Sequence, residues 1–425
     1  MVIEKTEINN KNRLLTVFFA VSCIIAVVAF LVSSPSEIFG GLMNLIISPQ
    51  SLTSDTIAIA GIGGAMLNAA LCGIMAALVI KLSHAKITGT SIAAFCLGVG
   101  FAFLGVNILN FAVLILGSYL FSVFDKKPFA EYANFSIFSG AVAPIVSEML
   151  FGKYLQLPLI ASIPAGLLAG IVIGAAFPIV CRHTSALHKG YDLFNAGVAG
   201  GFIAMAFFGL YKNVILKIAK QEFAMNSLFG GKFNKELLLF SIPALLIFLA
   251  GVILNKGFKG YGKLLSESGH QADFLDKYGL GVVLINFGLV YMVVLAYFEL
   301  SDFQWTAAAI ASLLGAAAWA GAGSHPKNVL PILIGYALFS LLTGTPLNNT
   351  TLTIGVGYAT GLSPVSGKFG ILWGILCGFI HAAVVFNTAA VHGGFCLYNG
   401  GFTAGLVCVV MVPVMEYFAS RKKEK

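Results

Sequence analysis

The stretch HKGYDLFNAGVAGG (His188–Gly201) recurs near the other end of the chain as HGGFCLYNGGFTAG (His392–Gly405), with six identities in fourteen positions. Each copy contains the pattern His-x-Gly-aromatic-x-Leu-aromatic-Asn-x-Gly. Such similarity between distant parts of one chain indicates an internal repeat.

Other matches follow in the same order. GVNILNFAVLILGSYLFSVF, from Gly105, aligns with GSHPKNVLPILIGYALFSLL, from Gly323, with six identities in twenty positions. Two single-residue pairs also align, Asn68 with Asn286 and Pro144 with Pro364. The offset is 218 residues early and 204 late, which one deletion in the second half explains. These ordered matches predict two homologous halves.

The composition places both halves in a membrane. Hydrophobic residues make up 58% of the 425 positions and charged residues 10%, against about 45–50% and about 25% in soluble domains. The apolar runs are as long as membrane-spanning helices and lack the alternation of barrel strands. The net charge of +8 comes largely from loops and termini, where membrane topology explains it without nucleic-acid binding.

Each half contains seven apolar segments. They cover residues 14–32, 56–82, 88–105, 108–124, 134–151, 163–180 and 191–210 in the first half, and residues 237–254, 280–298, 305–323, 329–342, 352–367, 371–389 and 395–418 in the second. The first segment follows a basic stretch, but it recurs in the second half, so we interpret it as a mature span and not as a signal peptide.

Basic residues indicate that the halves have opposite orientations, because short cytoplasmic loops concentrate Lys and Arg. The loop after the second segment carries Lys81 and Lys86, whereas its second-half counterpart carries none. The loop after the first segment of the second half carries Lys256, Lys259 and Lys263, and its first-half counterpart carries none. We therefore predict an all-α polytopic membrane protein built from two inverted-topology repeats of about seven segments each, with both termini in the cytoplasm.

In this scheme the first repeat covers residues 1–212, a connector covers 213–236, and the second repeat covers 237–425. The link between the repeats violates the charge rule, because it is placed outside the cell and yet carries five lysines: Lys212, Lys217, Lys220, Lys232 and Lys235. Either this stretch forms an amphipathic surface helix, or the segment count of one half is wrong by one.

The fifth segment of each half is short and interrupted by Pro and Gly. It contains Pro144 in FSIFSGAVAPIVSEML and Pro364 in LTIGVGYATGLSPVSGKFG. Proline frees a backbone carbonyl and glycine permits unusual backbone paths, so these segments can present helix ends to a solute, whether they span or re-enter the membrane. An ordinary proline kink is the alternative.

The repeated motif supplies further candidates for a solute path. Asn195 and Asn399 need hydrogen-bond partners inside a membrane, and either a polar solute or neighbouring helices can supply them. Aromatic residues of the same motif are candidates for the walls of the path, with core packing as the alternative: Tyr191, Phe194, Phe395 and Tyr398.

Ionisable residues inside membrane segments are functional candidates because charge there is costly. The leading candidates are Glu148 and Asp192. Neither aligns with an acid in the second half, and Asp192 aligns with Cys396. With His188 and His392 they are candidates for ion or proton coupling. Alternatively, both acids lie at the interface, solvated or paired with lysine, and the histidines are structural hydrogen bonders.

One family has a similar pattern. PVSG at Pro364–Gly367 followed by GGFCLYNGGFTAGL, and AVAPIVSE followed by HKGYDLFNAG, resemble the urea transporters, in which an NP-x-SG-like motif precedes a GL-x-G-(Y/F)-N-G-like motif in each of two inverted halves. The resemblance covers the last three segments of each half and implies a pore between the halves. Ala143 and Ser363 stand where that family has Asn, which argues against urea as the substrate. The chain also looks like uncharacterised duplicated prokaryotic membrane proteins.

Together these features predict a secondary transporter or channel in a prokaryotic cell membrane that moves a small polar solute between two inverted repeats. The sequence has no Walker A or HExxH motif, so we expect no enzymatic activity, no cofactor and no metal. The expected partners are the bilayer, the solute and, in a homo-oligomer, a second copy of the chain, but no nucleic acid. The alternatives are a structural or signalling subunit, and a membrane-embedded enzyme or lipid-handling protein that uses a cluster at residues 182–192: Arg182, His183, His188, Lys189 and Asp192.

Overall fold

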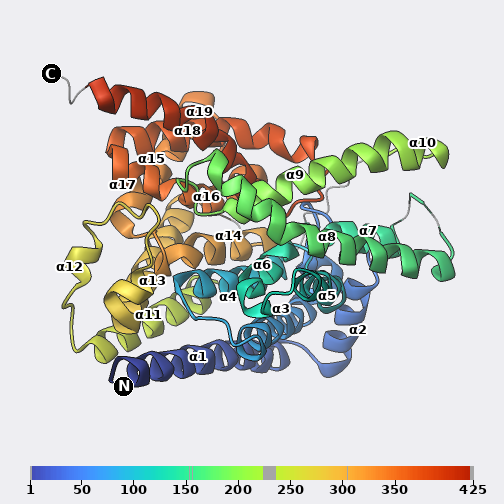
Figure 1. Cartoon of the computed structure of the whole chain (residues 1–425), viewed down its shortest axis with the longest axis horizontal. Coiled ribbons are helices and arrows are strands. Elements are labelled where there is room, and N and C mark those ends of the chain that lie inside the picture. The colour runs from blue at the N-terminus through green and yellow to red at the C-terminus, as the bar shows by residue number, and fades with distance from the viewer. Residues whose placement is uncertain (1, 153, 156, 224–235, 304, 422–425) are drawn as a thin grey trace.

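The structure is a computed structural model that describes residues 2–152, 154–155, 157–223, 236–303 and 305–421, and the regular elements in these ranges are all helices (Figure 1). The first half contains α1 (Val2–Val32), α2 (Pro35–Ile46), α3 (Thr56–Leu82), α4 (Gly89–Phe101), α5 (Ile108–Phe124), α6 (Ala133–Phe138), α7 (Ala143–Phe151), α8 (Leu159–Leu187), α9 (Asn195–Leu210) and α10 (Leu216–Ile218). The second half contains α11 (Glu236–Asn255), α12 (Tyr261–Leu264), α13 (Phe274–Leu300), α14 (Ala307–Ala318), α15 (Pro326–Thr343), α16 (Thr350–Ala359), α17 (Ser363–Phe369), α18 (Ile371–Val391) and α19 (Asn399–Arg421).

Nine helices in the described ranges are long and apolar enough to cross a membrane, and shorter apolar helices accompany them. The chain is therefore a multi-pass membrane protein. All fourteen predicted segments coincide with apolar helices in the same order, so the all-α polytopic prediction is confirmed. The fifth predicted segment of each half, which contains Pro144 or Pro364, is divided by a 3₁₀ turn. This turn separates α6 from α7 in the first half and α16 from α17 in the second.

Helices α4 and α14 are shorter than the sequence predicted. They contain 13 and 12 residues, so each is about 20 Å long, against about 30 Å for a bilayer core. Two buried asparagines, which we call the asparagine braces, bond main-chain oxygens in the turns that follow α4 and α14. Asn68 donates from Nδ2 to two main-chain oxygens after α4, at 3.2 and 2.7 Å, and Asn286 does the same after α14, at 2.8 and 2.7 Å. Each half therefore contains a helix that stops inside the protein.

Equivalent glycines bend the helices that precede these half-length helices. Gly61 in α3 has φ 67° and ψ 166°, and Gly279 in α13 has φ 80° and ψ 170°. Residues with a Cβ rarely adopt this conformation. The bend therefore requires glycine at both positions, which are 218 residues apart.

The two halves interlock through α9 and α19, which cross at glycines. A Cβ on Gly197 would lie 2.8 Å from the main chain of Gly401. Each helix repeats glycine four residues later, at Gly201 and Gly405. This small-xxx-small spacing allows two helix backbones to approach closely in a membrane.

Two backbone hydrogen bonds link the halves reciprocally. Leu193 N donates to Gly361 O at 3.1 Å, and its counterpart Leu397 N donates to Ala141 O at 2.7 Å. In each case the segment before the crossing helix of one half binds the 3₁₀ turn region of the other half. Such reciprocity is the contact pattern of a two-fold axis.

Figure 1 shows the chain starting on the left, reaching α10 on the right, and returning to the left at α19. A π-helical turn at Tyr211–Ile215 continues α9 into α10. The predicted connector is thus partly helical, and its residues 224–235 lie outside the described ranges, as do residues 422–425 of the basic C-terminal tail.

Candidate functional site

Six buried aromatic side chains lie where the two halves meet, and we call them the aromatic cluster. They form three equivalent pairs, with offsets of 218, 220 and 204 residues: Phe101 with Trp319, Phe138 with Tyr358, and Phe194 with Tyr398. The first and third offsets are those of the duplication, and the second is the offset between Pro144 and Pro364, so the cluster follows from the repeat.

Rings from the two halves contact each other within the aromatic cluster. The ring centroids of Phe194 and Tyr398 are 5.3 Å apart, and those of Phe101 and Tyr398 are 4.7 Å apart. Tyr358 lies 5.5 Å from Phe194 and 5.3 Å from Tyr398, and Trp319 lies 6.0 Å from Phe194. These separations are within the range of favourable aromatic packing, about 4.5–7 Å.

Every ring of the cluster stands at an interruption of a helix. One pair lies at the C-terminal ends of α4 and α14, and a second pair lies at the ends of α6 and α16, before the 3₁₀ turns. The third pair immediately precedes α9 and α19. Six interrupted helices therefore converge on one place, three from each half.

Four polar atoms at the cluster are buried and make no hydrogen bond in the described part of the chain. They are Trp319 Nε1, Tyr358 Oη, Tyr398 Oη and Asp192 Oδ2. The Trp319 indole lies beside the Tyr398 hydroxyl, but the two groups do not meet hydrogen-bond geometry. Buried polar groups are nearly always paired, and each unpaired one is costly. Four together therefore indicate a place for a bound species.

Asp192 is held in the segment before α9, and its side chain is 2% exposed. Its Oδ1 accepts a hydrogen bond from Phe194 N at 2.8 Å, while Oδ2 has no partner among the described residues. Gly361 makes room for the carboxylate, because a Cβ there would lie 2.7 Å from Oδ1. A Cβ on Gly405 would lie 3.3 Å from Oδ2. The acid thus occupies a space that glycines of the second half leave open.

The cluster has the same shape in both halves but not the same chemistry. The first half contributes three phenylalanines, and the second half contributes two tyrosines and a tryptophan at the equivalent positions. The acid, in contrast, is present only in the first half, because Asp192 aligns with Cys396 of the second half. Hydrogen-bonding rings therefore come from one half and the carboxylate from the other.

The repeated histidines and asparagines form a structural clasp in each half. His188 Nδ1 accepts from the main-chain N of Asp192 at 3.2 Å, and its Nε2 bonds Asn195 Oδ1 at 2.9 Å. His392 makes the same bonds, at 3.3 Å to Cys396 N and 2.9 Å to Asn399 Oδ1. A ring nitrogen that accepts an N–H carries no proton, so both imidazoles are held neutral.

The hydrogen-bonding groups of Asn195 are used inside the protein. Its Oδ1 also accepts from Thr184 Oγ1 at 2.8 Å, and its Nδ2 donates to Cys181 O at 2.7 Å. The equivalent Asn399 bonds its histidine in the same manner. Their place in the solute path stays a prediction, while their contacts are those of helix-bridging amides.

Two further aromatic groups lie outside the cluster, around the equivalent residues Tyr191 and Phe395. In the first, the Tyr191 layer, Tyr191 stacks on His270 at 4.1 Å and lies 5.2 Å from Phe369. In the second, the Phe395 layer, Phe395 is surrounded by Phe207, Phe208, Tyr211 and Phe223. Tyr191 and Phe395 are equivalent and buried, at 5% and 2% exposure. Each segment before α9 or α19 therefore runs from an outer layer into the cluster.

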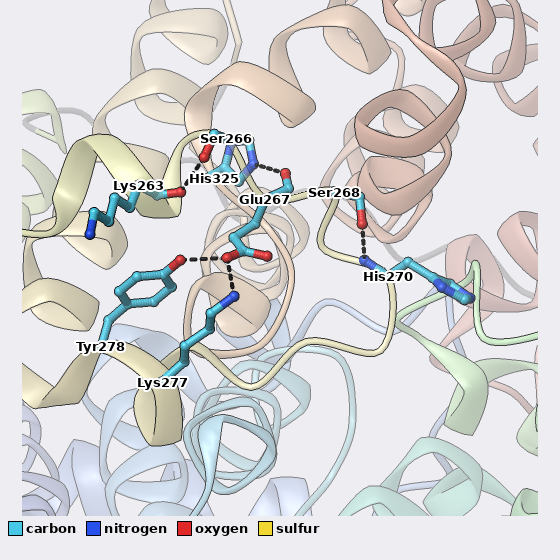
Figure 2. A network of polar contacts seen from close by, with 8 residues as sticks. All are labelled: Lys263, Ser266, Glu267, Ser268, His270, Lys277, Tyr278 and His325. Carbon is cyan, nitrogen blue, oxygen red and sulfur yellow. Dashed lines mark hydrogen bonds and ion pairs between the residues drawn. The ribbon is translucent and has the colours of Figure 1, made fainter.

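Figure 2 shows the loop that carries His270 into the Tyr191 layer. Glu267 accepts bonds from the Lys277 ammonium and the Tyr278 hydroxyl, and these bonds hold the pKa of Glu267 below its ordinary value. His325 Nε2 donates to Glu267 O at 2.9 Å. His270 Nε2 in turn donates to the main-chain oxygen of Lys189 at 2.8 Å. The loop thereby ties the second half to the segment that leads to Asp192.

The predicted site residues fall in several places. Phe194 and Tyr398 belong to the cluster, and Asp192 lies beside it. Tyr191 and Phe395 belong to the outer layers. Pro144 and Pro364 are buried at the second residues of α7 and α17, just after the 3₁₀ turns. Glu148 is buried beside the Phe395 layer, where Tyr211 donates to its Oε1 at 2.6 Å.

Sequence reasoning missed four rings of the cluster: Phe101, Phe138, Trp319 and Tyr358. The alignment already paired Phe101 with Trp319 and Phe138 with Tyr358 at the offsets of the duplication. An aromatic residue at both members of an aligned pair was the available signal, but nothing in the sequence placed these rings beside Asp192.

The cluster at residues 182–192, on which the enzyme alternative depends, is dispersed. Arg182 forms a salt bridge with Glu131 at 3.6 Å, and Lys189 forms one with Glu416. His188 is used in its clasp, while Asp192 faces the aromatic cluster. Arg182, His188, Lys189 and Asp192 are thus each engaged in a different contact.

Similarity searches place the chain in a family without assigning an activity. No curated protein and no solved structure is significantly similar to it, so the resemblance to urea transporters has no support from them. A family model does match, over two regions that fit a duplication, residues 34–213 and 253–417. On this match the chain belongs to the DUF1576 family, described as proteins of unknown function.

Proposed function

We propose that the protein is a transporter that moves a small polar solute across the membrane through the aromatic cluster. One observation carries the proposal: six interrupted helices bring four unpaired, buried polar atoms together where the halves meet. Solute sites in transporters built from inverted repeats lie at such interfaces, among discontinuous helices. A purely structural interface has no reason to leave these atoms unpaired.

The proposal includes an inverted arrangement of the two repeats. It is supported by the course of the chain, whose described ends both lie opposite α10 (Figure 1). The loop lysines of the two halves support it as well, because they occur in non-equivalent loops. In this arrangement both termini face the cytoplasm of a prokaryotic cell, and α10 faces outward.

The two outer layers favour a transporter over an open channel. Tyr191 and Phe395 are both buried among neighbouring rings. In the proposed inverted arrangement these equivalent residues lie on opposite sides of the cluster, so each group closes one side. Alternating access requires such closures at either side of a central site, opened one at a time.

Orientation can be tested with equivalent cysteines. His84 and Asp302 occupy equivalent exposed loops, 218 residues apart. In a Cys23→Ser background, which removes the exposed native cysteine, a membrane-impermeant maleimide should label His84→Cys and Asp302→Cys from opposite sides. Labelling of both from one side contradicts the inversion.

Transport can be tested by fixing one outer layer. Proteoliposomes containing Tyr191→Cys/His270→Cys should take up a solute from a panel of small polar compounds. Uptake should stop after treatment with a short bis-methanethiosulfonate and resume after reduction, because the crosslink holds the Tyr191 layer closed. Each single-cysteine variant is the control. Uptake that is unaffected by the crosslink, or absent for every solute of the panel, contradicts the proposal.

A further inference from the structure

The carboxylate of Asp192 has no cationic partner in the part of the chain that the structure describes. Among the residues that the structure describes, no ion pair involves it, and Lys189 is committed to Glu416. The titratable groups that face Asp192 are His188 in its own segment, Tyr398 before α19 and Cys408 in α19. None of these supplies a positive charge, because the imidazole is held neutral by its clasp.

A lone buried carboxylate is not stable as an anion. Moving a carboxylate out of water without a counter-charge costs far more free energy than contacts with neighbouring side chains provide. The group therefore takes up a proton or binds a cation. In this site the proton and the cation are alternatives, because both would bind the one unpaired oxygen, Asp192 Oδ2.

The aromatic cluster is chemically suited to a cation. Ring faces attract ammonium groups within about 6 Å of the centroid, and Trp and Tyr are the better rings. The rings of Phe194 and Tyr398 lie next to Asp192. Tyr358 packs against both of these rings, and the indole of Trp319 lies beside Phe194. The unpaired hydroxyls and indole N–H add hydrogen-bonding capacity for a polar substituent. An anion would instead meet the buried carboxylate.

We propose that the cluster binds a small organic cation of the ammonium type, which replaces a proton on Asp192. One proton leaves the carboxylate for each monovalent cation that enters, so the buried charge stays balanced. This assignment names the substrate class of the proposed transporter and rests on that function only for movement across the membrane. If the protein carries the cation through, inward movement of one is coupled to outward movement of the other.

The test is binding to the full-length protein in detergent, measured by calorimetry between pH 6 and 9 in buffers of different ionisation enthalpy. The probes are methylammonium, tetramethylammonium and choline, and 3,3-dimethylbutan-1-ol serves as the uncharged analogue of choline. At least one cation should bind and release about one proton, with affinity falling up to about tenfold per pH unit on acidification. The alcohol should bind at least about tenfold more weakly.

A variant assigns the effect to the acid. Asp192→Asn should weaken binding of that cation by about thirtyfold or more and abolish proton release. Glu416→Gln, which changes an exposed carboxylate paired with Lys189, is the matched control and should bind normally. Proton release by the unaltered protein is decisive even if Asp192→Asn does not fold.

Three results overturn the inference: no binding of any of the three cations at pH 9, binding without proton release over the whole pH range, or equal affinity for the uncharged alcohol. The outcomes separate this inference from the proposed function. Cation binding without uptake in proteoliposomes supports the site and contradicts transport. Uptake of a neutral solute without cation binding supports transport and contradicts the site.

Discussion

Some equivalent positions of the two halves carry the same residue, and others carry different residues. The asparagine braces Asn68 and Asn286 are identical, and each makes its two buried hydrogen bonds. The histidine–asparagine clasps are identical too. The pairs of the aromatic cluster and the pair Asp192 and Cys396 differ between the halves, and four of the seven unpaired buried polar atoms among the described residues lie there. Among these pairs, identity goes with the scaffold and difference goes with the candidate site.

This division has a physical reason. An acid at position 396 as well would bury a second carboxylate where the halves meet, and each buried carboxylate without a counter-charge is costly. One acid, faced by uncharged donors from the other half, avoids that second cost. The scaffold residues have the same backbone groups to satisfy in both halves, so nothing favours their divergence.

The largest effect on binding should come from moving the acid to the other half. Asp192→Cys should reduce affinity for the bound cation by about thirtyfold or more. The double variant Asp192→Cys/Cys396→Asp should recover most of this loss, because the main chain of Cys396 is held by the same clasp. Calorimetric titration of both proteins provides the measurement, with Cys396→Ser as the control. No recovery in a folded double variant would show that the surroundings, and not only the acid, are asymmetric.

The asparagine braces should respond equally in both halves. Asn68→Ala and Asn286→Ala each remove two hydrogen bonds to buried carbonyls, so each should lower the free energy of unfolding by about 2–4 kcal/mol. The check is SDS titration in mixed micelles. A difference of more than about 1 kcal/mol between the two variants would contradict the assignment of the pair to the scaffold.

The bent helices provide a second symmetric pair. Gly61→Ala and Gly279→Ala should each cost about 1–3 kcal/mol, since φ is positive at both sites. No neighbouring atom lies within 4 Å of the place that the added methyl group would occupy, so no clash adds to this cost. The same unfolding titration measures the loss. If either alanine is tolerated without loss, the bend on that side is not required for stability.

A tyrosine of the cluster should behave opposite to a scaffold tyrosine. Tyr398→Phe deletes a buried hydroxyl that has no partner among the described residues, so stability should be unchanged or rise by up to about 1 kcal/mol while cation affinity falls. Tyr336→Phe should instead cost about 1 kcal/mol, because that hydroxyl bonds His381 Nδ1 at 2.7 Å. Unfolding and binding are measured on both variants. A clear loss of stability in Tyr398→Phe would place its hydroxyl in the scaffold.

The smallest effect concerns the loop of Figure 2, which lacks a charged equivalent in the first half, where Pro49 aligns with Glu267. The lowered pKa of Glu267 means that its bonds stabilise the fold above the ordinary value of 4.5 and are lost as the pH falls through the lowered one. Lys277→Ala should cost less than about 1 kcal/mol at pH 7, because the pair is partly exposed. The difference from the unaltered protein should shrink as the pH falls below 4.5 and vanish once the carboxylate has taken up its proton. A cost that persists there would assign it to packing.

The sequence predicted the order and type of the elements because apolar length is a local property. All fourteen segments became apolar helices, and the fifth segment of each half became an interrupted one. It did not predict that α4 and α14 end early. Nothing in their composition distinguishes a helix that stops inside the protein from one that crosses, since the turn after α4 is stabilised by Asn68, which lies 34 and 38 residues away from the two carbonyls that it bonds.

The sequence by itself determined a duplicated, helical membrane protein, because hydrophobic length and repeated motifs are read directly from the chain. Only the tertiary structure decided which residues form the site. Phe101, Asp192, Trp319 and Tyr398 are far apart in sequence, and they meet because interrupted helices from both halves end at a shared axis. Packing between the halves sets that meeting point, and packing between distant segments is not encoded in any local pattern.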